Sequence, residues 1–491
     1  MKIEKKIIFV NPPSETKIIR EGRCEQRADS YQYLMVPISL PSSAAVLREA
    51  DFDVKIIDCI ADEINLKELE EILKKESPFF VIINVATMSF AKDKLAAEIC
   101  NKLKIPCAAM GMHVTTLPEE SLKESKFDFV IRGEPEMTAL NLAKAIGKDN
   151  LLKQVRGISY TENREFSVSQ TSKGKQEVRD RKKEKIIHNK DAELIQNLDE
   201  LPFPARDLLK NEKYIEPLTQ DPYTLVITGR GCPYGCIFCT ADKYYGKKQR
   251  IRSPKNIVDE IEEIIRKYGI THIGMWNDTF TFNKEQVIGI SKEILKRNIK
   301  IIWFCNSRVD TFDEERAKWM SQSGCKVITF GVESLDEEIL KRAKKNITLE
   351  QVKNAVEICK RYNIGSQLHL IFGLPGETEK TIENTIKNVI KLDPDYAQFY
   401  CAVPFPGTEF REYVLKNNFL KEVPWSQYEI NNSLISYPNL SSKKIQYARK
   451  KAYRKFYLRP KYILKKMKKF PMKEWRKISV QAYNFFKGWV F

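Results

Sequence analysis

The chain has 491 residues, which is enough for two or three domains that each bury a hydrophobic core. Hydrophobic residues make up 42% of it and charged residues 30%, a balance typical of soluble globular proteins. No run approaches the roughly 18 consecutive apolar residues that a membrane-spanning helix needs. The chain starts Met-Lys-Ile-Glu without the apolar core of a signal peptide, so we expect a cytoplasmic protein with reduced thiols.

The net charge of +18 is concentrated at one end of the chain. Residues 441–491 contain 17 Lys and Arg and a single acidic residue, Glu474, and therefore hold +16 of the total. The preceding 440 residues carry only +2, so we do not expect the body of the protein to bind nucleic acid.

Residues 1–150 are predicted to form a first domain in which strands and helices alternate. Apolar residues at four-residue spacing, as in Leu95, Ile99 and Leu103, indicate the helices between the strands. Alternating βα units of this length predict a parallel, doubly wound sheet, whose ligands bind at the carboxyl ends of the strands. The five expected strands cover 6–10, 54–57, 79–85, 105–110 and 127–131.

Residues 151–210 are predicted to be a connector. The stretch 173–190 is dense in Lys, Arg and Glu and has little apolar periodicity, which favours a solvated loop or hairpin. Its end, Leu201-Pro-Phe-Pro-Ala-Arg206, is expected to be extended, because the residue before a proline is biased away from helix.

Residues 211–405 are predicted to form a second series of βα units. Helical patterns follow the first five of its strands, so six repeats indicate a partial (β/α)6 barrel rather than a closed eightfold one. In βα barrels the chemistry lies in loops that follow strand ends. The six expected strands cover 223–228, 272–276, 300–305, 326–330, 367–372 and 397–403.

Residues 406–491 are predicted to be a mostly helical, basic region. Between 441 and 470, and again near the end, aromatic and aliphatic residues are interleaved with cations. Such a segment can lie in the interface of an anionic membrane. Two alternatives stay open: a helix packed on the barrel with a solvated basic face, and contact with an acidic partner.

Three cysteines lie within eight residues, in Cys232-Pro-Tyr-Gly-Cys236-Ile-Phe-Cys239, just after the first strand of the second series. Thiolates at this spacing can bind three irons of one iron–sulfur cube and leave the fourth iron open to a substrate. A structural zinc site would need a fourth Cys or His ligand. The nearest further cysteine in sequence, Cys305, falls in a predicted strand, so the loop favours a [4Fe-4S] cluster.

Most of the remaining cysteines are predicted to be free core residues. They are scattered among apolar neighbours, where an unpaired cysteine acts as a small hydrophobic side chain. These are Cys59, Cys100, Cys107, Cys305, Cys325, Cys359 and Cys401.

The cysteine spacing, with the aromatic Phe238 before the third cysteine, resembles the signature of the radical S-adenosylmethionine enzymes. The resemblance implies that loops after the strands hold the cofactor, with Arg308 and Glu333 at its carboxylate and amino groups and Phe238 beside its adenine. The supporting loops are Asn277-Asp-Thr-Phe-Thr281, Ser307-Arg308, Gly331-Val-Glu-Ser334 and Gly373-Leu-Pro-Gly-Glu-Thr378. The implied S-adenosylmethionine site comprises Phe238, Asp278, Arg308, Glu333 and Ser334.

The first domain has no Gly-x-Gly-x-x-Gly after its first strand, which argues against a dinucleotide. Its motifs, among them Asn11-Pro-Pro13, Gly111-Met-His-Val-Thr115 and Arg132-Gly-Glu-Pro-Glu136, resemble the cobalamin-binding domain of cobalamin-dependent radical S-adenosylmethionine enzymes. The family often has a second glycine where this chain has Met110. The Asp-x-His-x-x-Gly motif is absent, so we expect base-off cobalamin without a histidine below the cobalt. The implied contacts are Asn11, Pro13, Thr87, Gly111, His113, Thr115 and Glu134.

The resemblance implies a radical enzyme with three cofactors: a [4Fe-4S] cluster, S-adenosylmethionine and cobalamin. It would form a 5′-deoxyadenosyl radical, receive electrons from an external reductant such as flavodoxin or ferredoxin, and methylate an unactivated carbon. The basic tail suggests a lipid or another membrane-associated metabolite as the substrate. An oxidative cyclase or ring-forming enzyme of the same family is the alternative, and a non-catalytic iron–sulfur scaffold or sensor is a third hypothesis.

Overall fold

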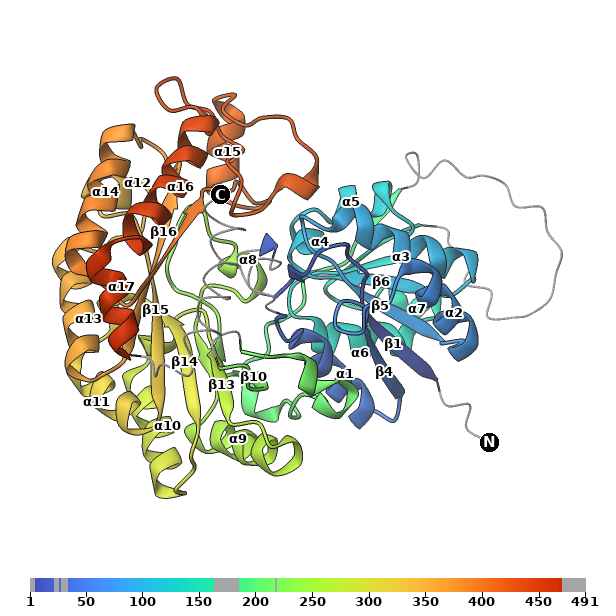
Figure 1. Cartoon of the computed structure of the whole chain (residues 1–491). Coiled ribbons are helices and arrows are strands. Elements are labelled where there is room, and N and C mark those ends of the chain that lie inside the picture. The colour runs from blue at the N-terminus through green and yellow to red at the C-terminus, as the bar shows by residue number, and fades with distance from the viewer. Residues whose placement is uncertain (1–4, 22–25, 28–33, 163–184, 217–218, 470–491) are drawn as a thin grey trace.

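The computed structural model describes residues 5–21, 26–27, 34–162, 185–216 and 219–469 of the chain. Figure 1 shows two lobes side by side, one built around a sheet from the first part of the chain and one around a sheet from the second part. Within the described residues, no helix is both long enough and apolar enough to span a bilayer.

The N-terminal lobe contains a seven-stranded sheet in the order β4-β1-β5-β6-β7-β8-β9. All five strands expected for the first domain are present and pair in parallel. Two further strands extend one edge in antiparallel fashion, and they come from the segment expected to be a connector. The strands are β1 (Lys6–Asn11), β4 (Asp53–Asp58), β5 (Phe80–Asn84), β6 (Cys107–Met110), β7 (Phe129–Ile131), β8 (Ile158–Thr161) and β9 (Ile186–His188).

Helices cover both faces of this sheet, which explains why its strands are apolar on both sides. In β1, Ile7 and Phe9 belong to the core under α1 and α6. Ile8 and Val10 belong to the core under α2 and α3 on the other face. The helices of this lobe are α1 (Ser39–Glu49), α2 (Leu66–Glu76), α3 (Phe90–Lys102), α4 (Met112–Thr116), α5 (Pro118–Glu124), α6 (Pro135–Ala145) and α7 (Asp149–Leu152).

The second lobe contains the six-stranded parallel sheet expected for a partial barrel, in the order β10-β13-β14-β15-β16-β17. Each strand pairs with its successor in the chain, and β10 and β17 form the two edges. Its strands are β10 (Tyr223–Ile227), β13 (His272–Trp276), β14 (Ile302–Ser307), β15 (Cys325–Glu333), β16 (Gly365–Phe372) and β17 (Tyr396–Cys401).

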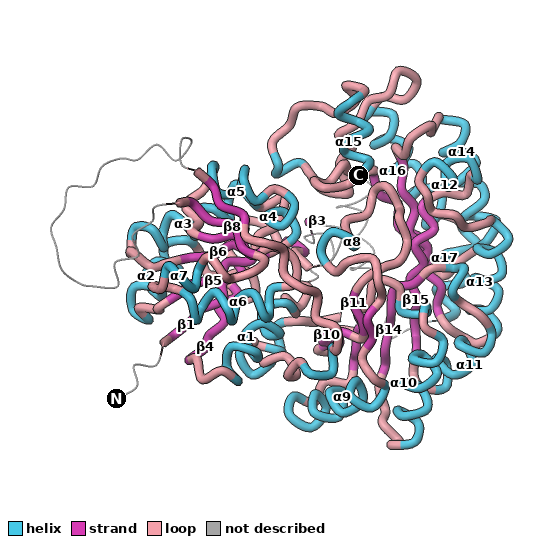
Figure 2. Tube along the Cα trace, turned by 180° about the vertical axis from the view of Figure 1, so that it is seen from behind, coloured by secondary structure: helices cyan, strands magenta, loops and turns pink. Residues whose placement is uncertain are grey.

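Helices that follow the strands cover the outer face of this sheet (Figure 2). They are α9 (Pro254–Tyr268), α10 (Lys284–Lys296), α11 (Glu314–Gln322), α12 (Glu337–Arg342), α13 (Leu349–Arg361) and α14 (Glu379–Leu392). Helix α15 (Glu409–Lys416) packs instead against Ile237, in the loop after β11. Five smaller elements remain: the helix α8 (Ala241–Tyr244), the strand pair β2 (Ile18–Ile19) with β3 (Gln26–Arg27), and the strand pair β11 (Gly229–Arg230) with β12 (Arg250–Ile251). Both views place α8 between the lobes.

The basic C-terminal helices α16 (Ser442–Tyr457) and α17 (Pro460–Lys469) pack onto the edge strand β17. The hydroxyl of Tyr453 accepts a hydrogen bond from the amide of Phe399 at 3.1 Å, and the Arg449 guanidinium donates to the carbonyl of Phe399 at 2.9 Å. Both helices therefore pack on the barrel, and the expected aromatic tail beyond them lies outside the described residues.

Candidate active site

The loop that carries the three cysteines spans residues 231–249, between β11 and β12. It begins at Gly231, which has φ of +90°, and a Cβ at this position would lie 2.3 Å from the carbonyl oxygen of Lys248. Only glycine combines this φ with such a close approach of backbone to backbone. The amide of Cys232 donates to the carbonyl of Gly246 at 3.2 Å, so the loop is tied to itself where the first cysteine begins.

None of the three cysteines forms a disulfide; Cys232 is buried, and Cys236 and Cys239 are partly exposed. The guanidinium of Arg308 lies 4.0 Å from the Cys236 sulfur, and the Thr279 hydroxyl lies 3.8 Å from the Cys232 sulfur. Within the described part of the chain, no three Cys, His, Asp or Glu side chains are placed to hold a single metal ion. A cube is bound through three different irons, so its ligands need not converge on one point, and a cation beside them favours thiolates.

Arg308 and Glu333, the expected contacts of S-adenosylmethionine, are joined by Lys345, a residue that sequence motifs did not reveal. The Lys345 ammonium is 2.9 Å from a carboxylate oxygen of Glu333, and its carbonyl accepts from Arg308 at 2.8 Å. Glu333 ends β15 with φ of +70°, a backbone conformation that residues other than glycine seldom adopt. Such strain often marks functional sites, and here it holds the carboxylate at the mouth of the barrel.

The other three expected cofactor residues in this lobe make local contacts. Asp278 accepts from the amide of Gly231 at 3.1 Å and so supports the start of the cysteine loop. Ser334 accepts from the amide of Asp336 at 3.2 Å. Phe238 packs against a small hydrophobic cluster that includes Ile237.

A cavity of about 50 Å³, open to solvent on one side, lies between the two lobes. Asn84 lines it at the carboxyl end of β5, and its side-chain nitrogen is buried without a hydrogen-bond partner. A buried donor of this kind is costly unless a ligand accepts from it, and the corrin ring of cobalamin carries amide side chains that can do so. Its other lining residues are Arg20, Glu21, Ser39, Gly111, Met112, Ala241, Tyr244, Tyr245, Trp276, Asn277, Asp278 and Asn306.

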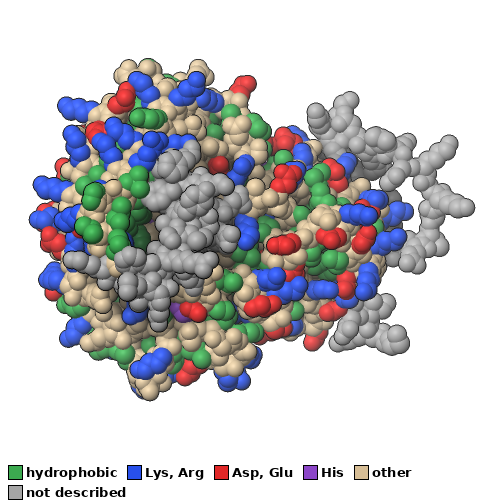
Figure 3. Space-filling model, viewed as in Figure 1, with side chains coloured by type: hydrophobic (Ala, Val, Ile, Leu, Met, Phe, Trp, Pro, Cys, Tyr) green, Lys and Arg blue, Asp and Glu red, His purple; other side chains and the backbone are tan. Residues whose placement is uncertain are grey.

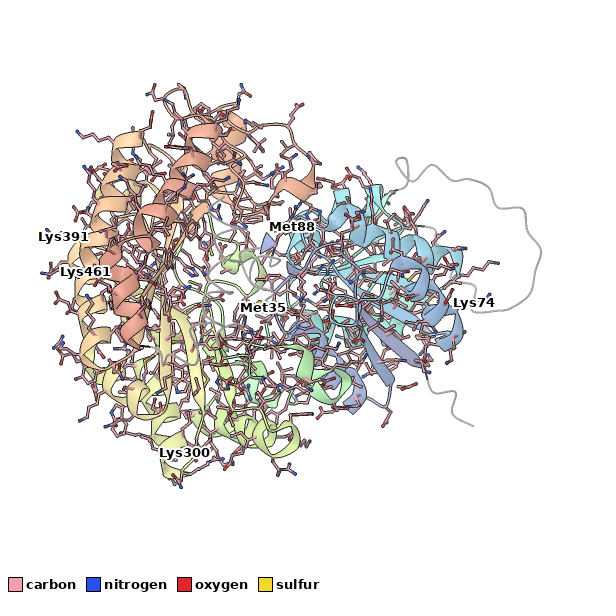
Figure 4. The ribbon with its side chains drawn as sticks, in the orientation of Figure 1. Met35, Lys74, Met88, Lys300, Lys391 and Lys461 are labelled. Atoms are coloured by element: carbon pink, nitrogen blue, oxygen red, sulfur yellow. The ribbon has the colours of Figure 1, made fainter. Side chains whose placement is uncertain are left out.

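This cavity fits the expected position of cobalamin, because it joins the strand ends of the first sheet to the cysteine loop. Gly111 lines it with φ of +125°, and a Cβ there would lie 2.2 Å from the carbonyl oxygen of Val85. In Figure 4, Met35 and Met88 are labelled in the middle of the view, where the lobes meet, and Lys461 at the outer surface.

Glu21 is a cavity residue that no sequence motif indicated. It accepts hydrogen bonds from the hydroxyl and the amide of Ser39. Burial, opposed by these hydrogen bonds, raises the pKa of its carboxyl to about 7. A group that titrates near neutral pH inside a cavity is a candidate for a functional role.

The expected cobalamin contacts near the first and third strands are held in a buried network. Asn11 donates to Asp58 at 2.8 Å and accepts from Arg20 at 3.1 Å, while Arg20 also pairs with the buried Asp93 at 2.6 Å. Pro13 is partly exposed, and Thr87 is buried at the start of the loop that leads to α3. The network fixes the Asn-Pro-Pro turn beside the strand ends.

His113 and Thr115 lie in α4, directly after Gly111. The His113 ring is fully buried, with its centroid 4.4 Å from that of Phe90 and 5.2 Å from that of Trp425. Burial lowers the pKa of His113 to about 3, so the imidazole is neutral. Thr115 accepts from the amide of Gly133 at 3.1 Å and so links the loops after β6 and β7.

Glu134, the last expected cobalamin contact, is bound to arginines of the other lobe. Its carboxylate receives two hydrogen bonds from Arg250, at 2.8 and 3.0 Å, and lies 3.4 Å from Arg230. The seven cysteines predicted to be core residues are buried and form no disulfide, as expected: Cys59, Cys100, Cys107, Cys305, Cys325, Cys359 and Cys401.

Two protein-family models match the chain. The B12 binding domain model covers residues 27–143, and the Radical SAM superfamily model covers residues 226–389. The two matches fall on the two lobes, in the order that the motifs predicted.

Known relatives agree with both matches. An uncharacterized methyltransferase of Pyrococcus horikoshii, PH0819, is 35% identical over 94% of each chain. The anaerobic magnesium-protoporphyrin IX monomethyl ester cyclase of Rubrivivax gelatinosus is 26% identical over 73% of this chain and 62% of its own.

Among solved structures, the radical S-adenosylmethionine methyltransferase TsrM of Kitasatospora setae, with cobalamin and a [4Fe-4S] cluster bound, has the same fold. Its TM-score is 0.67 at 18% identity, over 86% of this chain and 76% of that one. The two family matches and the near full-length relative show that the chain belongs to the cobalamin-dependent radical S-adenosylmethionine enzymes, a family that includes methyltransferases, and that its cofactors are a [4Fe-4S] cluster, S-adenosylmethionine and cobalamin.

Proposed function

We propose that this protein methylates an unactivated carbon of a small molecule or lipid. The observation that carries the proposal is the cavity between the lobes, because its lining comes from strand ends of the first sheet, from the cysteine loop and from strand ends of the second sheet. When bound, the cluster with S-adenosylmethionine supplies an adenosyl radical and cobalamin supplies a methyl carrier. One cavity shared by both lobes would bring the two functions together.

The chain's own residues have separate tasks in this proposal. Cys232, Cys236 and Cys239 hold the cluster, and the cation of Arg308 favours the thiolate form of Cys236. Arg308 and Glu333 orient the charged end of S-adenosylmethionine, since a guanidinium pairs with a carboxylate and a carboxylate with an ammonium. On the opposite wall, the free amide donor of Asn84 is placed for an acceptor on cobalamin.

The test is anaerobic reconstitution of the full chain with iron, sulfide and hydroxocobalamin, followed by addition of S-adenosylmethionine and dithionite. The wild type is expected to bind corrinoid and to release 5′-deoxyadenosine and S-adenosylhomocysteine. Cys236→Ala should lose cluster absorbance and 5′-deoxyadenosine release, whereas Cys401→Ala, a buried free thiol elsewhere in the barrel, should keep both. Release of 5′-deoxyadenosine by Cys236→Ala would refute the radical assignment.

A ring-forming oxidative reaction is the second candidate, and the similarity to the Rubrivivax gelatinosus cyclase favours it. The two reactions differ in one product. A methyltransferase forms S-adenosylhomocysteine, and a cyclase that uses S-adenosylmethionine only as a radical source does not. An iron–sulfur scaffold or sensor without turnover would form neither this product nor 5′-deoxyadenosine.

An external one-electron reductant such as flavodoxin or ferredoxin belongs to the same proposal.

We also propose that α17 contacts the cytoplasmic surface of an anionic membrane. Ile463, Leu464 and Met467 lie on one side of α17 and are exposed by 43%, 57% and 39%. Figure 3 shows hydrophobic side chains exposed among Lys and Arg on this part of the surface. Apolar side chains bordered by cations suit an anionic bilayer interface.

Co-sedimentation with phosphatidylglycerol vesicles tests the membrane contact. Exchange of two apolar side chains in Ile463→Ser/Leu464→Ser is expected to weaken binding. Leu295→Ser/Ile302→Ser removes two similarly exposed apolar residues from another surface and should bind like the wild type. Equal binding by both double variants would exclude α17 as the contact.

A further inference from the structure

The base of the cysteine loop is a two-stranded ribbon. In it β11 pairs antiparallel with β12, so that Arg230 lies opposite Arg250. The loop that carries Cys232, Cys236 and Cys239 leaves from the first of these strands and returns to the second. The position of these two arginines therefore fixes the positions of both ends of the loop.

Two carboxylates of the N-terminal lobe bind both ends of the ribbon. Glu136, in the first turn of α6, receives two hydrogen bonds from Arg230, at 2.5 and 3.2 Å. Glu134, just before that helix, receives two from Arg250, at 2.8 and 3.0 Å. Two-pronged pairs of this kind fix orientation as well as distance. We call Glu134, Glu136, Arg230 and Arg250 the stem clamp.

The stem clamp is shielded from water and balanced in charge. The side chains of its four members are between 2% and 3% exposed, and two carboxylates face two guanidiniums. Arg250 also donates to the carbonyls of Ile195 and Tyr245, at 2.6 and 2.7 Å. The ring of Tyr245 lies 5.3 Å from the Arg230 guanidinium, so a loop residue covers the pair. Burial makes such pairs sensitive to the loss of either partner.

We propose that Glu134 and Glu136 are positioning residues for the cluster, and that the N-terminal lobe holds the cysteine loop in place through the stem clamp. The inference rests on the proposed function only for the presence of the cluster. It assigns Glu134 to the loop stem, because both of its carboxylate oxygens are bound to Arg250. The lobe that binds cobalamin would thereby also set the geometry of the radical-forming site.

The test compares Glu134→Gln and the double variant Glu134→Gln/Arg250→Gln with the wild type, each reconstituted with iron and sulfide. The double variant leaves no unpaired charge, so it separates positioning from the cost of an orphaned arginine. Glu260→Gln is the matched control, because Glu260 is as buried and binds two arginines, Arg206 and Arg252, within and beside the barrel. Readouts are iron per chain, the electron paramagnetic resonance spectrum of the reduced cluster with and without S-adenosylmethionine, and 5′-deoxyadenosine release under dithionite.

We expect the double variant to keep its iron, to show a changed spectrum with S-adenosylmethionine, and to release 5′-deoxyadenosine at least about tenfold more slowly, because small displacements of reacting groups cost large factors in rate. Glu260→Gln should keep the wild-type spectrum. A double variant with the wild-type spectrum and rate would overturn the proposal, as would an equal change in Glu260→Gln. These readouts need neither cobalamin nor a methyl acceptor, so failure of methyl transfer would refute the proposed function but not the positioning role of the stem clamp.

Discussion

Glu21 places a titrating carboxyl in the cavity between the lobes, and Glu21→Gln removes its charge while keeping its shape. The side chain is 9% exposed and accepts from the amide of Ser39 at 3.3 Å. A glutamine oxygen can accept the same hydrogen bonds from Ser39. The substitution therefore isolates the effect of the ionisable proton.

The size of the effect follows from the pKa of Glu21, which burial raises from 4.5 to about 7. Because the folded protein binds this proton more tightly than the unfolded chain, stability is highest below pH 4.5 and is lost as the pH rises through about 7. A shift of this size corresponds to about 3 kcal/mol of unfolding free energy in total. Most of that loss, about 2.5 kcal/mol, falls between about pH 5 and about pH 8.

The assay is urea denaturation of the full chain at about pH 5 and about pH 8, because those values bracket the transition of Glu21. Glu21→Gln is expected to match the wild type at the lower pH and to be more stable at the higher pH by about 2 to 3 kcal/mol. Glu98→Gln, which removes an exposed carboxylate from α3, is the control and should follow the wild type at both. Parallel pH profiles for wild type and Glu21→Gln would show that the carboxyl is not held protonated by burial.

Three further substitutions test other contacts. Gly231→Ala forces a Cβ toward the Lys248 carbonyl and should abolish cluster assembly, seen as loss of bound iron per chain. His113→Phe should retain hydroxocobalamin, measured by visible spectroscopy, because the imidazole is neutral and packed between aromatic rings. The pKa of His113 lies at about 3 in the folded protein, so the wild type loses unfolding free energy as the pH falls below about 6.5, and His113→Phe should remove this loss. Lys345→Met leaves Glu333 without its ammonium partner and should lower 5′-deoxyadenosine release, whereas Lys345→Arg should keep part of it. Unchanged release by Lys345→Met would show that Lys345 has no role in the cofactor site.

Much of the architecture follows from local sequence, because strand-forming runs and helical periodicity alternate within each of the two βα series. Runs such as Phe80–Asn84 are apolar on both faces, which identifies central parallel strands. The pair β8 and β9 was expected to be a connector. These strands are four and three residues long, and the pairing of β8 with the edge of β7 cannot be read from composition.

The candidate site could be predicted only where residues share a short segment or a strand end. Cys232, Cys236 and Cys239 are close in sequence, and the fold keeps them on one loop. Lys345 could not be predicted because it lies after a helix and belongs to no motif, and only the fold brings it to Glu333. His113 was expected in the cobalamin site from its loop, and its contact with Trp425, more than 300 residues later, could not be predicted from that loop.

The polar lining of the cavity limits the kind of methyl acceptor that can react there. Asn84, Asn277 and Asp278 line it together with Glu21, and covering polar groups of this kind with a purely apolar ligand costs free energy. A lipid chain would leave the buried amide nitrogen of Asn84 without an acceptor, whereas cobalamin amides or a polar head group can accept from it. We therefore expect a lipid substrate to enter with a polar end in this cavity and its chain outside it, which agrees with a membrane contact on the surface rather than a buried lipid channel.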